Sequence, residues 1–153
     1  EGCGANFMHA SPRLKSVVDL ARLAVSKYGP ALQDAPTEVC SERGLVMNAI
    51  KRCPACLEFA HPALRDDDEL VLTAVRKDGS ALKFASERLR SDLNIALPAI
   101  AKNGEALEFV GGSLVERSDL ILTAVRQTGT ALRWVGEQQR LRDVVLAAVQ
   151  SGG

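Results

Sequence analysis

Marker residues return every 25 positions along this chain of 153 residues, with no insertion between copies. We call the residues at the same position in successive copies a column. The clearest column is a turn position, and the columns two, three and five residues later hold small residues, leucines and aromatic residues, respectively. Their members are Gly29, Pro54, Gly79, Gly104 and Gly129; Ala31, Cys56, Ala81, Ala106 and Ala131; Leu32, Leu57, Leu82, Leu107 and Leu132; and Asp34, Phe59, Phe84, Phe109 and Trp134. A fixed period of this size means that each copy is one supersecondary unit that buries its apolar face against its neighbours.

The third copy, residues 66–90, departs least from the others and predicts how a unit is built. Its first helix should begin after Asp67 or Asp68, whose carboxylates can accept hydrogen bonds from the free amides of a helix start. We expect the helix to end just before Gly79. This glycine should adopt the left-handed conformation of a C-terminal cap, which glycine reaches without steric cost. The apolar face between these ends is formed by Leu70, Val71, Ala74 and Val75.

A second, short helix and a single helical turn should complete each unit. The second helix should stop at a column of turn residues, namely Pro36, His61, Ser86, Gly111 and Gly136. Leu64, Leu89 and Leu114 then anchor the final turn, before a new cap at Asp92 or Ser118. Helices this short are marginal alone in water, so stacking must stabilise them.

The fold class that follows is an all-α short solenoid of five repeats plus a final helix. We expect an N-terminal extension over residues 1–10 and a single helical-repeat domain over 11–153. Its units should cover residues 16–40, 41–65, 66–90, 91–115 and 116–140, followed by a terminal helix over 141–150. Asp34 replaces the aromatic residue in the first unit, which favours a polar capping repeat there, and Pro98 should remove one backbone hydrogen bond from its helix.

Composition excludes several classes of protein. With 46% hydrophobic and 25% charged residues, and 19 basic residues against 19 acidic ones, the chain is typical of a soluble globular protein without overall steering toward nucleic acid. Its apolar runs are shorter than the roughly 20 residues of a membrane span. Four cysteines are too few for a disulfide scaffold. We expect a reducing compartment, the cytosol or an organelle interior, after removal of a targeting segment before Glu1.

The columns of the third copy resemble an uncharacterised family of tandem short-helix repeats, known as a domain of unknown function. Its members repeat a pattern similar to Val-Leu-x-Ala-Val-x-x-x-Gly-x-Ala-Leu-x-Tyr-Ala-Ser-x-x-Leu-x-x-Asp, which residues 70–92 match best. Residues 95–115 and 120–135 match it moderately, and the second unit is weaker because Pro54 and Cys56 replace Gly and Ala. The resemblance implies an all-helical repeat fold, and it brings no catalytic or binding residues.

Cys53-Pro-Ala-Cys56 is the sharpest local motif. Two thiols at this spacing can form a redox pair or half of a zinc site. The motif falls on a turn between helices, whereas a thioredoxin-like site needs a strand before its helix. The favoured interpretation is that Cys56 fills the small-residue column and Cys53 is a turn residue, so we expect no cofactor, with a metal or redox module as the alternative.

Basic residues recur near the end of each first helix, and stacking should align them along one edge of the array. They are Lys27, Lys51, Arg52, Arg76, Lys77, Lys102 and Arg126. Such a row could bind an acidic protein or, as a third hypothesis, track a nucleic-acid backbone. Acidic residues at the helix starts balance the row, and both sets suit the helix dipole.

The aromatic column predicts a core ladder and leaves no stacking platform for bases. Trp134 differs because it lies near the end of the array, where its indole N–H could reach an outside acceptor. The sequence shows no nucleophile with an activating partner, no acid–base pair and no phosphate loop. We therefore predict a non-catalytic repeat protein that works as an interaction module or accessory subunit, with another protein as its partner.

Overall fold

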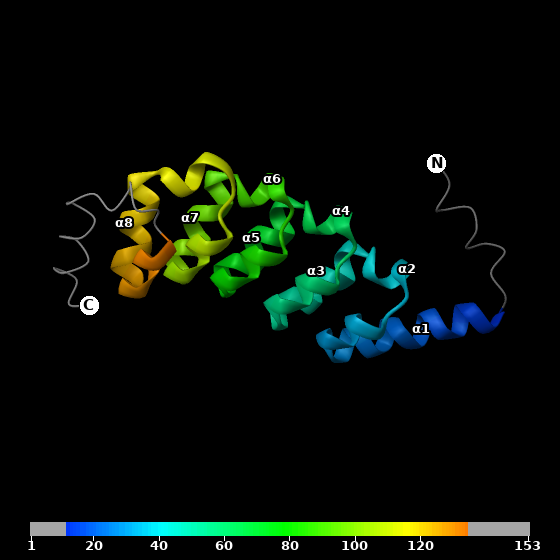
Figure 1. The fold of residues 1–153 in the computed structure, drawn as a ribbon. Coiled ribbons are helices and arrows are strands. Elements are labelled where there is room, and N and C mark those ends of the chain that lie inside the picture. The colour runs from blue at the N-terminus through cyan, green and yellow to red at the C-terminus, as the bar shows by residue number, and fades with distance from the viewer. Residues whose placement is uncertain (1–11, 135–153) are drawn as a thin grey trace.

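The structure, a computed structural model, describes residues 12–134 of the chain, and every secondary-structure element within them is a helix. The predicted N-terminal extension and the predicted terminal helix over 141–150 lie outside the described residues. Figure 1 shows the longer helices side by side in a row that runs from one end of the described residues to the other. These are α1 (Pro12–Lys27), α3 (Arg43–Arg52), α5 (Asp68–Lys77), α7 (Leu93–Lys102) and α8 (Ser118–Gln127).

A six-residue 3₁₀ helix follows each longer helix where the sequence predicted a second short helix. These segments are η2 (Gly29–Asp34), η3 (Pro54–Phe59), η4 (Gly79–Phe84), η5 (Gly104–Phe109) and η7 (Gly129–Trp134). Side chains three residues apart align on a 3₁₀ helix. Gly79, Leu82 and Ala85 are buried at that spacing, so the tighter helix buries one complete row.

The predicted final turn is present after each of the first four 3₁₀ helices. It forms α2 (Thr37–Cys40), α4 (Pro62–Arg65), α6 (Glu87–Arg90) and η6 (Gly112–Glu116), and the first three lie along one side of the row in Figure 1. Leu89 is fully buried, whereas Leu64 and Leu114 are half-buried against the core. The three-part organisation of a unit is therefore confirmed, with the 3₁₀ geometry of its middle part as a correction.

One continuous apolar core runs along the row from Val18 to Ala131. The predicted apolar face of α5 is confirmed, because Leu70, Val71, Ala74 and Val75 are all fully buried. The aromatic column lies differently from the prediction of a core ladder. Its members are half-buried and pack against the margin of the core, since the leucine column fills the centre: Phe59, Phe84, Phe109 and Trp134.

Glycine in the turn column permits close packing between units, and the predicted left-handed cap at Gly79 is wrong. Gly112 alone among the described residues has a positive φ, of 61°. A methyl group at Gly79 would lie 2.2 Å from the carbonyl oxygen of Ala99, and one at Gly104 would lie 2.4 Å from that of Ala124. At these positions η4 rests directly on the backbone of α7, and η5 rests on that of α8.

Backbone hydrogen bonds join consecutive units at the same place in each. The amide of His61 donates to the carbonyl of Cys40 at 3.0 Å, that of Ser86 to Arg65 at 2.9 Å, and that of Gly111 to Arg90 at 3.0 Å. Arginine side chains add a second connection. Nε of Arg65 donates to the carbonyl of Phe84 at 2.6 Å, and Nε of Arg90 donates to that of Phe109 at 2.8 Å. The 25-residue period is therefore also a period of inter-unit bonds.

The first helix differs from its later copies in length and in what it exposes. Val17 stands at the position of the N-cap residues Glu42, Asp67 and Asp92, and in this first copy the turn before that position is continuous with the long helix. The two fuse into the 16-residue α1. Asp34 is exposed, in line with the expected polar residue, whereas α1 also exposes the apolar side chain of Leu20.

Two smaller predictions concern helix ends and breaks. Helix α8 begins at Ser118 after Arg117, and Ser118 does not cap it. Pro98 lies inside α7, which runs unbroken through it from Leu93 to Lys102.

Candidate interaction surface

The seven basic residues predicted as a row are all exposed at the C-terminal ends of the long helices. We call them the basic edge: Lys27, Lys51, Arg52, Arg76, Lys77, Lys102 and Arg126. Because the long helices stand side by side, their ends form one margin of the array (Figure 1). The sequence-predicted set is thus brought to one side of the molecule, one or two residues from each unit.

Two members of the basic edge hold the preceding helix. Nη1 of Arg52 donates to the carbonyls of Ser26 at 2.7 Å and Lys27 at 3.2 Å, at the end of α1. Nζ of Lys77 donates to the carbonyl of Lys51 in α3. The last carbonyls of a helix lack intrahelical partners and carry its negative partial charge, so these cations stabilise the junction between units.

None of the seven side chains forms an ion pair within residues 12–134. The neighbouring residues at the same helix ends add a single carboxylate, that of Asp78. Its Oδ1 already accepts hydrogen bonds from the Ser80 amide at 3.0 Å and the Ser80 hydroxyl at 2.7 Å. The basic edge therefore carries an excess of positive charge that the described residues leave uncompensated.

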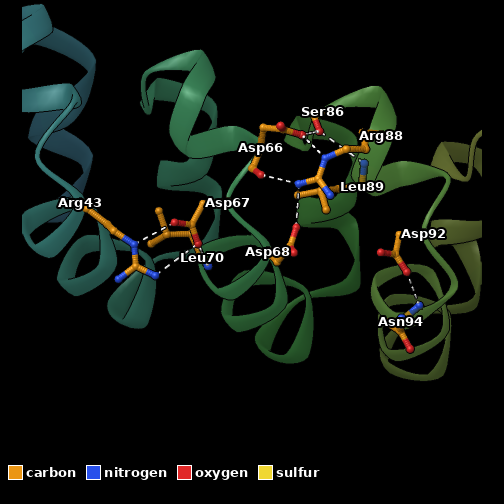
Figure 2. A network of polar contacts seen from close by, with 10 residues as sticks. All are labelled: Arg43, Asp66, Asp67, Asp68, Leu70, Ser86, Arg88, Leu89, Asp92 and Asn94. Atoms are coloured by element: carbon orange, nitrogen blue, oxygen red, sulfur yellow. Dashed lines mark hydrogen bonds and ion pairs between the residues drawn. The ribbon is translucent and has the colours of Figure 1, made fainter.

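Carboxylates at the opposite ends of the helices are paired with arginines, as Figure 2 shows. Arg43 reaches from α3 to the start of α5, with 2.8 Å from Nε to Asp67 and 2.5 Å from Nη2 to Glu69. Arg88 bridges Asp66 at 3.0 Å and Asp68 at 2.7 Å. Similar pairs join Arg22 to Glu42 and Arg117 to Asp119.

The pKa values follow this pairing. The Arg43 guanidinium is the main cause that lowers the pKa of Asp67, with the Leu70 amide adding to it at 3.0 Å as the predicted N-cap contact. The pKa of Asp66 is lowered chiefly by the Ser86 hydroxyl and then by Arg88. These carboxylates stay ionised at neutral pH, and their charge is balanced locally.

Trp134 is held by a carboxylate of the preceding unit. Its Nε1 donates to Glu105 Oε2 at 2.8 Å, so the indole N–H that the sequence left open for an outside acceptor has an internal partner. Nη2 of Arg133 contacts the same oxygen at 2.8 Å, and its guanidinium lies 4.8 Å from the centre of the indole ring. Hydrogen bonds from Thr130 first, and then from Trp134, lower the pKa of Glu105.

The cysteine pair lies at the junction of α3 and η3. Cys56 is buried in the small-residue column, as predicted, and burial together with the neighbouring Cys53 thiol raises its pKa to about 12. Cys53 is half-buried at the turn. Cys40 is also a free, buried thiol, whose pKa burial raises, and Sγ lies 3.5 Å from the carbonyls of Leu32 and Ala35.

Metal binding has no cluster to support it in the part of the chain that the structure describes, where no three His, Cys, Asp or Glu side chains converge. His61 caps α4, and its Nδ1 accepts from the Ala63 amide at 3.2 Å. A protonated, desolvated thiol at Cys56 is a poor nucleophile and a poor ligand, because both roles need the thiolate.

Sequence reasoning missed residues that cap the 3₁₀ helices and residues that join the units. Asp78 and Asn103 cap the 3₁₀ helices, and Arg65 and Arg90 bind carbonyls of the next unit. Asp78 and Asn103 are 25 residues apart, as are Arg65 and Arg90. This spacing was the sequence signal that could have found them. None of the helices over residues 12–134 has the length and apolarity needed to cross a bilayer.

The fold and the basic edge define an all-helical tandem-repeat protein. A family model described as "Domain of unknown function (DUF4116)" matches the chain three times in tandem, over residues 18–65, 42–90 and 67–115. The chain belongs to this family. No curated protein and no solved structure matches the chain.

Proposed function

We propose that the protein is a non-catalytic repeat module, built from five 25-residue units and a final helix, that binds an acidic surface of another protein through its basic edge. In this role it is a structural or accessory subunit of a larger assembly. The observation that carries the proposal is the difference between the two margins of the array. At one margin most carboxylates form ion pairs with arginines, whereas the other margin leaves its cations free of ion pairs within the described residues.

The spacing of the cations suits a folded partner. Packed helices lie about 8–10 Å apart, so successive units present charge at regular intervals along a rigid margin. Charge at such a margin mainly raises the association rate and selects partners, while contacts at the centre of an interface supply affinity. The proposal therefore predicts binding that weakens with salt and is not abolished by it.

A reducing compartment, the cytosol or an organelle interior, is part of the proposal. The free thiols of Cys40, Cys53 and Cys56 are compatible with it. The high pKa of Cys56 argues against the alternative of a metal or redox module at Cys53 and Cys56.

The test is a charge reversal at three members of the basic edge that donate to no carbonyl of the described residues: Lys51→Glu, Arg76→Glu and Arg126→Glu. The matched control reverses three other exposed cations: Arg13→Glu, Lys15→Glu and Lys83→Glu. The tagged wild type and both variants are purified from the source organism, with nuclease treatment, and co-purifying proteins are quantified by mass spectrometry.

We expect one partner protein to co-purify in stoichiometric amount with the wild type and with the control variant, and to be absent from the basic-edge variant. The thermal midpoint of the basic-edge variant should change little. Equal retention by the two variants would contradict binding through this edge. Loss of all binding after nuclease treatment, with a steep salt dependence of the wild type, would establish the nucleic-acid hypothesis instead.

A further inference from the structure

The exposed face of α1 is the face that later units bury. Leu20 is 66% exposed, yet its counterparts one to four periods later are largely buried, with Leu70 at 0%, Ile95 at 3% and Leu120 at 0%. Ala24 is exposed as well, whereas all four of its counterparts are buried: Ala49, Ala74, Ala99 and Ala124. Leu20 and Ala24 occupy the same columns as these buried residues. Helix α1 therefore presents the surface that is an inter-unit interface in later copies, and no described residue packs on it.

In later units, this interface is covered by the 3₁₀ helix of the preceding unit. A methyl group at Gly29 would lie 3.3 Å from Cα of Ala49, and those at Gly79 and Gly104 would collide with the carbonyls of Ala99 and Ala124. The glycine always precedes the alanine by 20 residues. The counterpart that would rest on Ala24 is therefore Gly4.

The residues around Gly4 carry the same columns. Gly4, Phe7, Ala10 and Ser11 stand 75 positions before Gly79, Leu82, Ala85 and Ser86. Pro12, Leu14 and Lys15 stand 50 positions before Pro62, Leu64 and Arg65, which form α4. Two positions differ, since Asn6 occupies the small-residue column and His9 the aromatic one.

We propose that the segment Gly4–Ala10, which carries the columns of an additional repeat, docks on the apolar face of α1, with Gly4 over Ala24. The reach is adequate. From Pro12 to Ala24 the helix rises about 18 Å at 1.5 Å per residue. The eight residue steps from Gly4 to Pro12 can span up to about 26 Å, which exceeds this distance. The proposal is independent of the basic edge.

The first test measures protection of the covered face in the full 153-residue chain. Single cysteines replace Leu20 or Leu23 in a background with Cys3→Ser and Cys53→Ser, and their labelling by a maleimide is timed. Leu23 is the matched control, because it is 54% exposed and its counterparts Asn48, Thr73, Pro98 and Thr123 are never fully buried. We expect L20C to label at least about tenfold more slowly than L23C.

The second test uses the close approach itself. Gly4→Val should abolish the protection and lower the thermal midpoint of the otherwise native chain by about 2–12 °C, as expected for an overpacked contact. Gly2→Val, outside the repeat columns, should change neither. Equal labelling of L20C and L23C, together with an unchanged midpoint for Gly4→Val, would overturn the proposal. So would protection that survives Gly4→Val and rises with protein concentration, because a second copy would then cover the face.

Discussion

Replacing Gly79 by alanine should destabilise this protein, although the same change at an exposed helical glycine stabilises most proteins. The added methyl group would lie 2.2 Å from the Ala99 carbonyl oxygen and 3.0 Å from Cβ of Asn103. The nearest of these atoms belongs to the backbone, so it cannot rotate away. Relief requires η4 and α7 to separate.

The size of the effect follows from that separation. Moving the two atoms to an ordinary contact of about 3.2 Å opens the interface by about 1 Å, which removes a quarter to half of the van der Waals attraction of the contacts across it. Overpacking of this kind costs about 1–3 kcal/mol. Gly44 is the matched control, since it lies in α3 with no atom within 4 Å of an added methyl group. Gly44→Ala should stabilise the fold by about 0.4–1 kcal/mol.

Urea denaturation followed by circular dichroism measures both variants, and thermal midpoints should move by about 2–4 °C per kcal/mol. Gly79→Asn separates the two explanations of the glycine. Asparagine is tolerated in the left-handed region, so a conformational requirement would make it milder than alanine. If close approach is the reason for the glycine, Gly79→Asn should destabilise the protein more than Gly79→Ala does, because its side chain is larger. A Gly79→Ala variant as stable as the wild type would refute the close-packing argument.

Two further predictions concern ionisable groups. The folded-state pKa of Asp67 is lowered by Arg43, so its contribution to stability is complete above the unfolded value of about 3.9 and is lost as pH falls through the folded value. Asp67→Asn, which keeps a capping oxygen, should lower the free energy of unfolding by about 0.5–1 kcal/mol at pH 7. The difference from the wild type should shrink as the pH falls through the folded-state pKa of Asp67, and pH-dependent urea titrations check this. Because Cys56 is buried, its labelling by a thiol reagent at pH 7 should occur only as fast as the protein unfolds, and its pKa of about 12 lowers the reactive thiolate fraction further. Rapid labelling of Cys56 in native buffer would contradict its burial.

Much of the fold follows from local pattern. The spacing of Leu70, Val71, Ala74 and Val75 determined the long helix and its buried face, and Asp67 marked its start. The role of Gly79 did not follow, because a left-handed cap and a close approach both call for glycine. The backbone dihedral of Gly79 and its contact with Ala99, 20 residues further along, distinguish them.

The candidate site was predictable in its members but not in their partners. Position in each repeat placed the basic residues at one edge, and the structure confirms that placement. The hydrogen bonds from Arg52 to the end of α1 and from Trp134 to Glu105 cross between units. A one-dimensional pattern cannot show which side chain bends toward a neighbouring unit and which points to solvent.

Bonds that join each unit only to the next one give this molecule a graded stability. The cross-unit hydrogen bonds connect residues about one period apart, and each long helix packs on the following one. The free energy of unfolding is then approximately a sum of the stabilities of the single units and of the interfaces between neighbouring units. Amide hydrogen exchange should therefore be slowest in α5 and α7 and become faster stepwise toward either end. A single weak junction in the middle would divide the array into two separately melting halves.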